Sequence, residues 1–194
     1  MNSILYLSSL VALLSQLVQA DPPTICSRPG LAALTFDDGP YDYQNQIGDY
    51  LHNRGINGTF FVNGNNYDCI YDEQYVQRLK RRPLNWIAYL VAPKYQHLVG
   101  PTLNQQLDLV ERALMKILGV KPKFFRAPYG EHNKQSLDIL AKRGYTVVDW
   151  SFDSGDSVGA TPESSMKGYN KLARSFPPLR SLSITRLTKL RPQK

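Results

Sequence analysis

The 194-residue sequence contains few of the residues that cross-link small secreted domains or bind transition metals. It has two cysteines, Cys26 and Cys69, and three histidines, His52, His97 and His132. A chain of this length can bury the sizeable core of one domain without a dense set of disulfides. Cys26 and Cys69 can pair in an oxidising compartment, or both can be free buried thiols.

Charge is absent from the first twenty residues. An apolar run at 4–17 leads into VQA at 18–20, a small-residue cleavage pattern, and Asp21 with two prolines follows. The run is too short for a good membrane span, so residues 1–20 are predicted to be a signal peptide, with a signal anchor as the alternative. We therefore expect a secreted mature chain without a membrane span, in which Asn57 begins a glycosylation sequon.

Acidic residues are missing from two tracts, 78–100 and 179–194. Together these tracts hold ten of the 23 lysines and arginines, and without them the net charge would fall from +7 to −3. The basicity is thus a property of two tracts rather than of the domain. With a secreted destination, this argues against a nucleic-acid partner.

Short apolar runs alternate with helical patterns along the rest of the chain. The expected strands lie at 31–36, 58–62, 124–126 and 145–150, and the expected helices at 43–54, 72–80, 103–118, 134–143 and 162–173. The clearest helix has an apolar stripe, which consists of Leu103, Leu107, Val110, Leu114 and Ile117. This alternation predicts an α/β fold with a parallel sheet or barrel.

Polar residues follow three of the expected strands. They are Asp37 and Asp38, then Arg126, then a group of three acids, Asp149, Asp153 and Asp156. Chemistry gathers at such strand ends in α/β folds. Each group also has an ordinary explanation, because Asp-Gly pairs form turns, an arginine can be a surface cation, and acids can line a solvated loop. Spacing alone leaves the two interpretations open.

Three motifs resemble a known family. The sequences LTFDDGP, FFRAPYG and VVDWSFDSGDS are similar to the first, third and fourth motifs of the NodB-homology polysaccharide deacetylases, carbohydrate esterase family four, and especially to those of fungal chitin deacetylases. The resemblance covers residues 26–78 and 102–178. It implies one domain over 26–178 with a distorted (β/α) barrel. It also implies a monomeric, secreted or cell-wall hydrolase that removes N-acetyl groups from chitin or a related polymer with a divalent metal, zinc or cobalt.

The resemblance assigns roles to four residues of the first and third motifs. Asp37 would be the general base, and Asp38 a ligand of the metal. Arg126 would pair with Asp37 and keep it ionised. The backbone N–H of Tyr129 would face the oxyanion that forms during amide hydrolysis.

The fourth motif implies a substrate pocket lined by Trp150, Asp153 and Asp156. In the family, this motif also helps to orient the catalytic histidine. The family's usual aromatic residue after the last aspartate is replaced by Ser157. The expected pocket for the acetyl group would therefore lack this aromatic side chain in its wall.

Two family motifs are missing from the sequence. The second, a His-x-x-x-His pair that supplies two metal ligands, should lie within 78–101, where the only histidine is His97. The fifth, Leu-x-His, should lie in the tail at 179–194, which has no histidine. His52 and His132 are expected to be surface or capping residues. Zinc held by one aspartate and one histidine would lack the three protein ligands of a catalytic site, and the barrel would end incomplete after the helix at 162–173.

The genetic code suggests a cause for both gaps. Read one nucleotide later with permitted synonymous codons, residues 85–95 can encode IGSHTWSHQNI, with histidines from the codons of Ala88 and Ala92; residues 81–83 can encode EGH. Residues 182–187, read two nucleotides later, can encode LNHET. These are the forms of the missing motifs. We therefore interpret 78–101 and 179–194 as frame-disrupted sequence.

Three functional interpretations follow, and they belong to different classes. The first is a secreted, metal-dependent chitin deacetylase. The second is an inactive relative that still binds carbohydrate. The third is a frame-disrupted product that does not fold. The missing histidines favour the second or third for the present chain, with His97 as the only substitute ligand in the sequence.

Overall fold

The computed structural model describes residues 21–27, 31–81, 87–89, 101–175 and 184–187. The expected signal peptide at 1–20 lies outside the described residues, as does His97. Of the two anomalous tracts, only short pieces are described, among them 87–89 and 184–187.

Within these described ranges, seven parallel strands form one sheet. They are β1 (Ala33–Gly39), β2 (Gly58–Val62), β3 (Ile87–Tyr89), β4 (Phe124–Phe125), β5 (Thr146–Val147), β6 (Phe152–Asp153) and β7 (Ile184–Leu187). Their order in the sheet is β5-β4-β3-β2-β1-β7-β6, and every pairing is parallel. The expected parallel α/β architecture is therefore confirmed.

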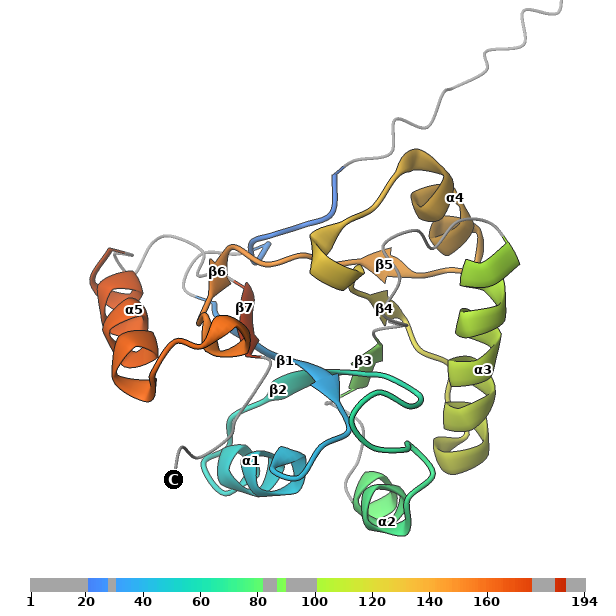
Figure 1. The fold of residues 1–194 in the computed structure, drawn as a ribbon, viewed down its shortest axis with the longest axis horizontal. Coiled ribbons are helices and arrows are strands. Elements are labelled where there is room, and N and C mark those ends of the chain that lie inside the picture. Colours follow the sequence, from blue (N-terminus) through green and yellow to red (C-terminus); the bar gives the residue numbers. More distant parts are fainter. Residues whose placement is uncertain (1–20, 28–30, 82–86, 90–100, 176–183, 188–194) are drawn as a thin grey trace, which may run out of the picture.

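The part of the chain that the structure describes has five α-helices, and they lie around the sheet (Figure 1). They are α1 (Gln44–His52), α2 (Glu73–Arg81), α3 (Pro101–Leu118), α4 (Lys134–Lys142) and α5 (Pro162–Ser175). Each lies within about two residues of its expected bounds. The strand expected at 145–150 is shorter, because only Thr146 and Val147 pair with β4.

Two of the strands lie in the anomalous tracts, where none was expected. β3 lies between β2 and β4, and β7 lies between β1 and β6. The expectation that the barrel is cut off after the helix at 162–173 is wrong in one respect, because β7 follows α5 and pairs with β1. Strand pairing joins backbone groups rather than particular side chains, so short runs with Ile, Tyr or Thr can complete a sheet without the family's motif residues.

The two edge strands, β5 and β6, are close in the sequence. Only residues 148–151 separate them, and the five Cα–Cα steps from Val147 to Phe152 span at most roughly 18 Å. The sheet must therefore curve until its edges approach. Among the described residues no pairing joins β5 to β6, so a closed barrel is not resolved.

The core lies between the sheet and the helices. The apolar stripe predicted for α3 is confirmed, since its five residues are all buried, with relative exposures of 0–7%. Phe36 of β1 and Phe60 of β2 stack at 4.8 Å between ring centroids and belong to the same core. Burial of this apolar surface is the main stabilising contribution to the domain.

Two secretion-related expectations can be compared with the structure. Cys26 and Cys69 are both free, so the disulfide alternative is wrong for this structure. Asn57 is exposed, as an acceptor of a glycan must be. No helix among the described residues is long and apolar enough to cross a bilayer.

Candidate active site

A buried ion pair lies at the carboxyl ends of β1 and β4. Arg126 Nη1 donates hydrogen bonds to Asp37 Oδ1 and to Thr35 Oγ1, both at 2.8 Å. The side chains of Arg126 and Asp37 are only 1% and 2% exposed. The expected pairing of these two residues is therefore present, and the alternative in which Arg126 is a surface cation is wrong.

The other donors of Arg126 are also held. Nε donates to the carbonyl of Val148 at 3.1 Å, and Nη2 to the carbonyl of Asp149 at 3.3 Å. The guanidinium lies 4.1 Å from the ring centroid of Phe61 and 5.5 Å from that of Trp150, distances at which aromatic faces attract cations. Contacts from β1, β2 and the segment after β5 thus fix one cation beside Asp37, which favours its ionised form.

Asp37 and Asp38 have different surroundings although they are adjacent. Asp37 is buried, whereas Asp38 is half-buried and has a φ of 65°. This left-handed conformation is uncommon for a residue other than glycine and is frequent at functional sites. The turn that follows is tied to β2, because the N–H of Asn63 donates to the carbonyl of Gly39 at 2.6 Å. Arg126 therefore offsets the charge of Asp37, whereas Asp38 is half-buried and has a left-handed backbone conformation.

The Tyr129 turn comes directly after β4. Tyr129 has a φ of 58°, Gly130 a φ of 72°, and the side chain of Tyr129 is 65% exposed. A Cβ at Gly130 would lie 3.2 Å from the Trp150 ring, so glycine lets this turn approach the indole closely. The structure therefore gathers Arg126, the Tyr129 turn and Trp150. That the Tyr129 N–H faces an oxyanion stays a prediction.

Asp153 and Asp156 lie in and after β6, where their carboxylates bond locally. Asp153 Oδ1 accepts from the N–H of Gly155 at 2.8 Å, and Asp156 Oδ1 accepts from the hydroxyl of Ser154. These contacts shape the turn into the short 3₁₀-helix at Asp156–Val158. Their role in an acetyl pocket, with Ser157 in its wall, stays a prediction.

Sequence reasoning missed Thr35 and the contact between His132 and Asp149, although it named Asp149 as one of three acids that follow a strand. Thr35 could have been found, because residues two apart on a strand point to the same face, and Thr35 is two residues before Asp37. His132 Nε2 lies 3.4 Å from Asp149 Oδ2, and Asn133 rather than His132 caps α4. The expectation for His132 is therefore wrong, whereas His52 is exposed at the end of α1 as expected.

Asp149 sits in a partly desolvated position. Its Oδ1 atom is buried without a hydrogen-bond partner. Burial raises the pKa of the Asp149 carboxyl above its usual value, while the nearby His132 and Arg126 oppose this shift. Since its backbone carbonyl also accepts from Arg126, Asp149 connects the ion pair to His132.

The residues present do not fit the metal centre that the family implies. Within the part of the chain that the structure describes, no three His, Cys, Asp or Glu side chains come together to hold an ion. Asp38 occupies its expected place in the turn, but His52 lies on α1 and His132 contacts Asp149. The donor set of a catalytic zinc site, three protein ligands around one ion, is thus missing from these residues.

An all-parallel sheet surrounded by helices, with a buried carboxylate–arginine pair at its carboxyl end, defines an α/β protein of the class that binds ligands at that end. Comparison with known families gives the assignment. The family described as polysaccharide deacetylase matches residues 25–148. The chain therefore belongs to the polysaccharide deacetylase family, whose members hydrolyse C–N bonds and depend on a metal.

The relatives are fungal and bacterial. A chitin deacetylase of Pestalotiopsis sp is 35% identical over 138 residues, which are 69% of this chain and 45% of that protein. The chitin deacetylase of Colletotrichum lindemuthianum is 34% identical over 148 residues, which are 72% of this chain and 58% of that protein. The structure of the chitin deacetylase from Colletotrichum lindemuthianum matches with a TM-score of 0.74 and 28% identity, covering 86% of this chain and 76% of that one. The chain spans about half the length of the curated relatives it matches.

Proposed function

We propose that the gene encodes an extracellular chitin deacetylase, which removes N-acetyl groups from chitin or chitooligosaccharides. We further propose that the present chain keeps the carboxylate–arginine part of the site and lacks its metal ligands. The observation that carries the proposal is the buried cluster of Thr35, Asp37 and Arg126. Such a pair is expensive to bury, and its place at the strand ends suits a base for hydrolysis.

The roles of the side chains follow from this cluster. Arg126 holds Asp37 Oδ1 and favours the carboxylate, so that Asp37 can take a proton from a water molecule that attacks the acetyl carbon. The C–N bond then breaks, acetate leaves, and the sugar amine takes up a proton. The Tyr129 turn would donate its N–H to the oxygen on which negative charge develops. Trp150, which lies against Gly130, would form an apolar wall beside the acetyl methyl group.

A second candidate function is carbohydrate binding without catalysis. It is favoured by the missing donor set, because the two tracts where family histidines should lie contain one histidine between them. A site with Asp38 as its one metal-binding side chain would hold zinc weakly. Under this candidate, the strand-end cluster would recognise an acetylated sugar and leave it unchanged.

The test compares the present chain with a frame-restored variant. In that variant, EGH replaces residues 81–83, IGSHTWSHQNI replaces 85–95, and the five residues LNHET replace the six residues 182–187. We expect the variant to retain stoichiometric zinc after dialysis and to release acetate from chitooligosaccharides, and the present chain to do neither. Asp37→Asn in the variant is the matched control, which should retain zinc and lose acetate release.

Two results would contradict these proposals. Stoichiometric zinc together with acetate release by the present chain would show that the missing histidines are not needed. Failure of the frame-restored variant to release acetate, although folded and loaded with zinc, would remove the enzyme proposal. The nucleotide sequence tests the frame interpretation separately, because the codons of Ala88 and Ala92 must yield histidine codons in the next frame.

A further inference from the structure

Asp149 lies where three segments of the chain meet. Its N–H donates to the carbonyl of Pro23 at 3.1 Å, and its own carbonyl accepts from Arg126 Nη2 at 3.3 Å. Its side chain contacts a third segment, because Oδ2 lies 3.4 Å from His132 Nε2. One residue therefore connects the arginine of the buried pair to the segment that follows the Tyr129 turn.

The Asp149 carboxylate is used differently from those of the two acids that follow it. Asp153 and Asp156 each accept with Oδ1 from a neighbour in their own turn. Both backbone groups of Asp149 already have partners, and its side chain is only 16% exposed, against 23% for His132. Burial of a carboxylate costs free energy unless a partner compensates. The carboxylate therefore serves a contact between distant segments rather than the shape of its own turn.

One end of this contact sets the direction of Arg126. The carbonyls of Val148 and Asp149 accept from Nε and Nη2 of the guanidinium, and Nη1 of the same planar group donates to Asp37. Because the guanidinium is rigid, a shift of the segment after β5 would turn all of its donors together. The place of Asp149 thus affects the hydrogen bond that Asp37 receives.

The other end of the contact holds the Tyr129 turn. His132 comes two residues after Gly130, where a Cβ would lie 3.2 Å from the Trp150 ring. Tyr129 itself has a φ of 58°, and a residue other than glycine keeps such a conformation only where surrounding contacts hold it. The contact of His132 with Asp149 anchors the chain directly after this turn.

We propose that His132 and Asp149 are positioning residues, which hold the Tyr129 turn and Arg126 in a fixed relation to each other. Neither is assigned a contact with the reacting atoms. The catalytic consequence rests on the proposed function, in which the turn faces the oxyanion and Arg126 orients Asp37. The contact itself does not depend on catalysis and can be tested in the present chain.

Acrylamide quenching of Trp150 fluorescence tests the contact. The sequence has two tryptophans, Trp86 and Trp150, so Trp86→Phe leaves Trp150 alone, and this single-tryptophan chain is the parent. His132→Ala should raise the quenching constant about twofold, because the turn against the indole loses an anchor and opens more often. His132→Gln should keep the parent value, since its amide nitrogen can donate to the same carboxylate.

A double variant tests whether the two residues act as a pair. His132→Ala/Asp149→Ala should have the same quenching constant as Asp149→Ala alone, because the loss of His132 matters only while its partner is present. His52→Ala is the control of the same residue type, exposed at the end of α1, and should leave the constant unchanged. Thermal unfolding curves identify any variant that is destabilised.

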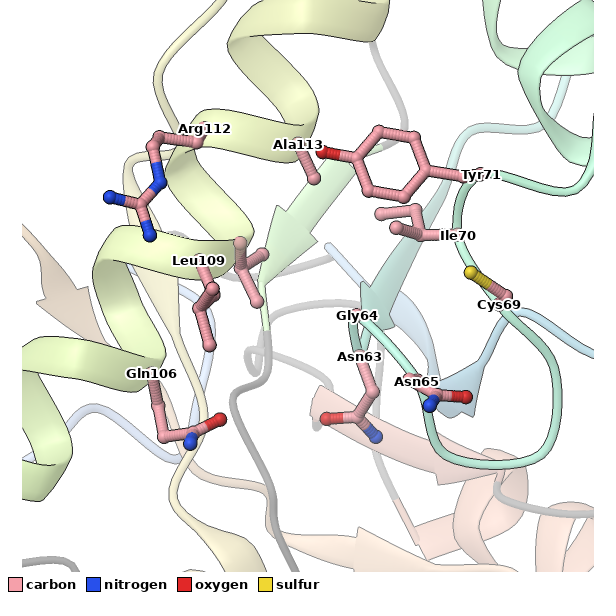
Figure 2. Close-up of a pocket in the computed structure, with 11 residues that line it drawn as sticks. Asn63, Gly64, Asn65, Cys69, Ile70, Tyr71, Gln106, Leu109, Arg112 and Ala113 are labelled. Carbon is pink, nitrogen blue, oxygen red and sulfur yellow. The ribbon is translucent and has the colours of Figure 1, made fainter.

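A second control removes a side chain at the same end of the sheet. Figure 2 shows Gln106 on α3 and Asn63 directly after β2, on opposite walls of a cavity of about 330 Å³. Neither His132 nor Asp149 lines this cavity. Gln106→Ala should therefore leave the quenching of Trp150 unchanged. Equal quenching constants in Gln106→Ala and His132→Ala would overturn the proposal.

Kinetics of the frame-restored variant measure the catalytic consequence. There His132→Ala should lower kcat about tenfold and change KM by less than about twofold, as misplacement of reacting groups does, and His132→Gln should retain most of the activity. Unchanged kcat in His132→Ala would overturn the positioning role. If the frame-restored variant is itself inactive, the proposed function falls, while quenching in the present chain still decides whether the pair holds the turn.

Discussion

Two arginines in this protein each bind acidic partners, but in opposite surroundings. Arg126 and Asp37 are only 1% and 2% exposed. Arg143 is 20% exposed, and its partners Asp108 and Glu111 are 49% and 18% exposed. A buried pair recovers its desolvation cost poorly, whereas a partly exposed one loses less hydration and gains less attraction.

The second cluster joins two helices. Arg143, at the end of α4, donates to Asn104, Asp108 and Glu111, which are spaced along one face of α3. The hydroxyl of Tyr145 donates to the same Glu111 carboxylate at 2.9 Å. The Arg143 cluster therefore has a structural explanation, while the cost of burying Arg126 with Asp37 points to a role in chemistry.

Replacing one member of the buried pair should have the largest effect. In Arg126→Ala, Asp37 would remain buried without its cation, so we expect the free energy of unfolding to fall by about 3–5 kcal/mol. Urea denaturation measures this loss. The double variant Asp37→Leu/Arg126→Met should be more stable than Arg126→Ala, because no unpaired charge remains. A single variant as stable as the parent would mean that the pair is not desolvated.

The helix-joining cluster should be more tolerant. Arg143→Ala removes several hydrogen bonds but leaves acids that can be hydrated, so we expect a loss of about 1–2 kcal/mol in the free energy of unfolding. The control is Arg174→Ala, at an exposed position near the end of α5, which should change stability by less than about 0.5 kcal/mol. A loss in Arg143→Ala as large as that in Arg126→Ala would break the contrast between the clusters.

The pH dependence of stability should show whether Asp149, like the buried ion pair, is a desolvated charge. Because burial raises the pKa of Asp149 above its usual value of 3.8, the folded state holds this proton more tightly than the unfolded state. Its contribution to stability is therefore present below pH of about 4 and is lost as the pH rises through the raised pKa. Asp149→Asn should remove this loss.

The free energy of unfolding of Asp149→Asn and of the parent is measured by urea denaturation at several pH values from about 3 to 7. The quantity compared is the difference between the two proteins at each pH. We expect the difference to shift in favour of the variant as the pH rises. His132 and Arg126 face Asp149 and oppose the effect. A difference that stays constant with pH would show that Asp149 is not desolvated.

The smallest effect is expected at a solvent-exposed pair. Lys134 and Asp138 form an ion pair one turn apart on α4, at 2.9 Å, with 86% and 40% of their side chains exposed. Lys134→Ala should change the free energy of unfolding by less than about 0.5 kcal/mol, and this small change should vanish at high salt. A larger loss that does not depend on salt would show that solvent exposure does not determine how much an ion pair contributes to the stability of this protein.

Local pattern predicted the regular parts of the fold well. The α3 stripe is buried because apolar residues at helical spacing need one common face, and the strand GTFFV at 58–62 has the bounds that its apolar run indicated. The alternation of strands and helices predicted parallel pairing. β3 and β7 could not be predicted, because each is short and owes its place to backbone partners on both sides.

The candidate site was predictable only in part. The sequence motifs indicated four site residues, Asp37, Asp38, Arg126 and Tyr129. The structure contains the expected pairing of Asp37 with Arg126. His132 and Asp149 are 17 residues apart in the sequence. His132 lies in the loop after the Tyr129 turn and Asp149 in the segment after β5, and no periodic pattern in the sequence predicts that two such segments are in contact. Their contact follows from how the segments after β4 and β5 pack.

The sequence by itself determined the alternating elements, the apolar face of α3, and the shortage of histidines in the two tracts where the family motifs should lie. Only the tertiary structure decided which groups share one environment. Arg126 and Asp37 lie 89 residues apart, and their pairing requires β1 and β4 to lie in one parallel sheet. Local preferences act over a few residues, whereas burial and charge pairing depend on distances in space, which the chain acquires only when the sheet has formed.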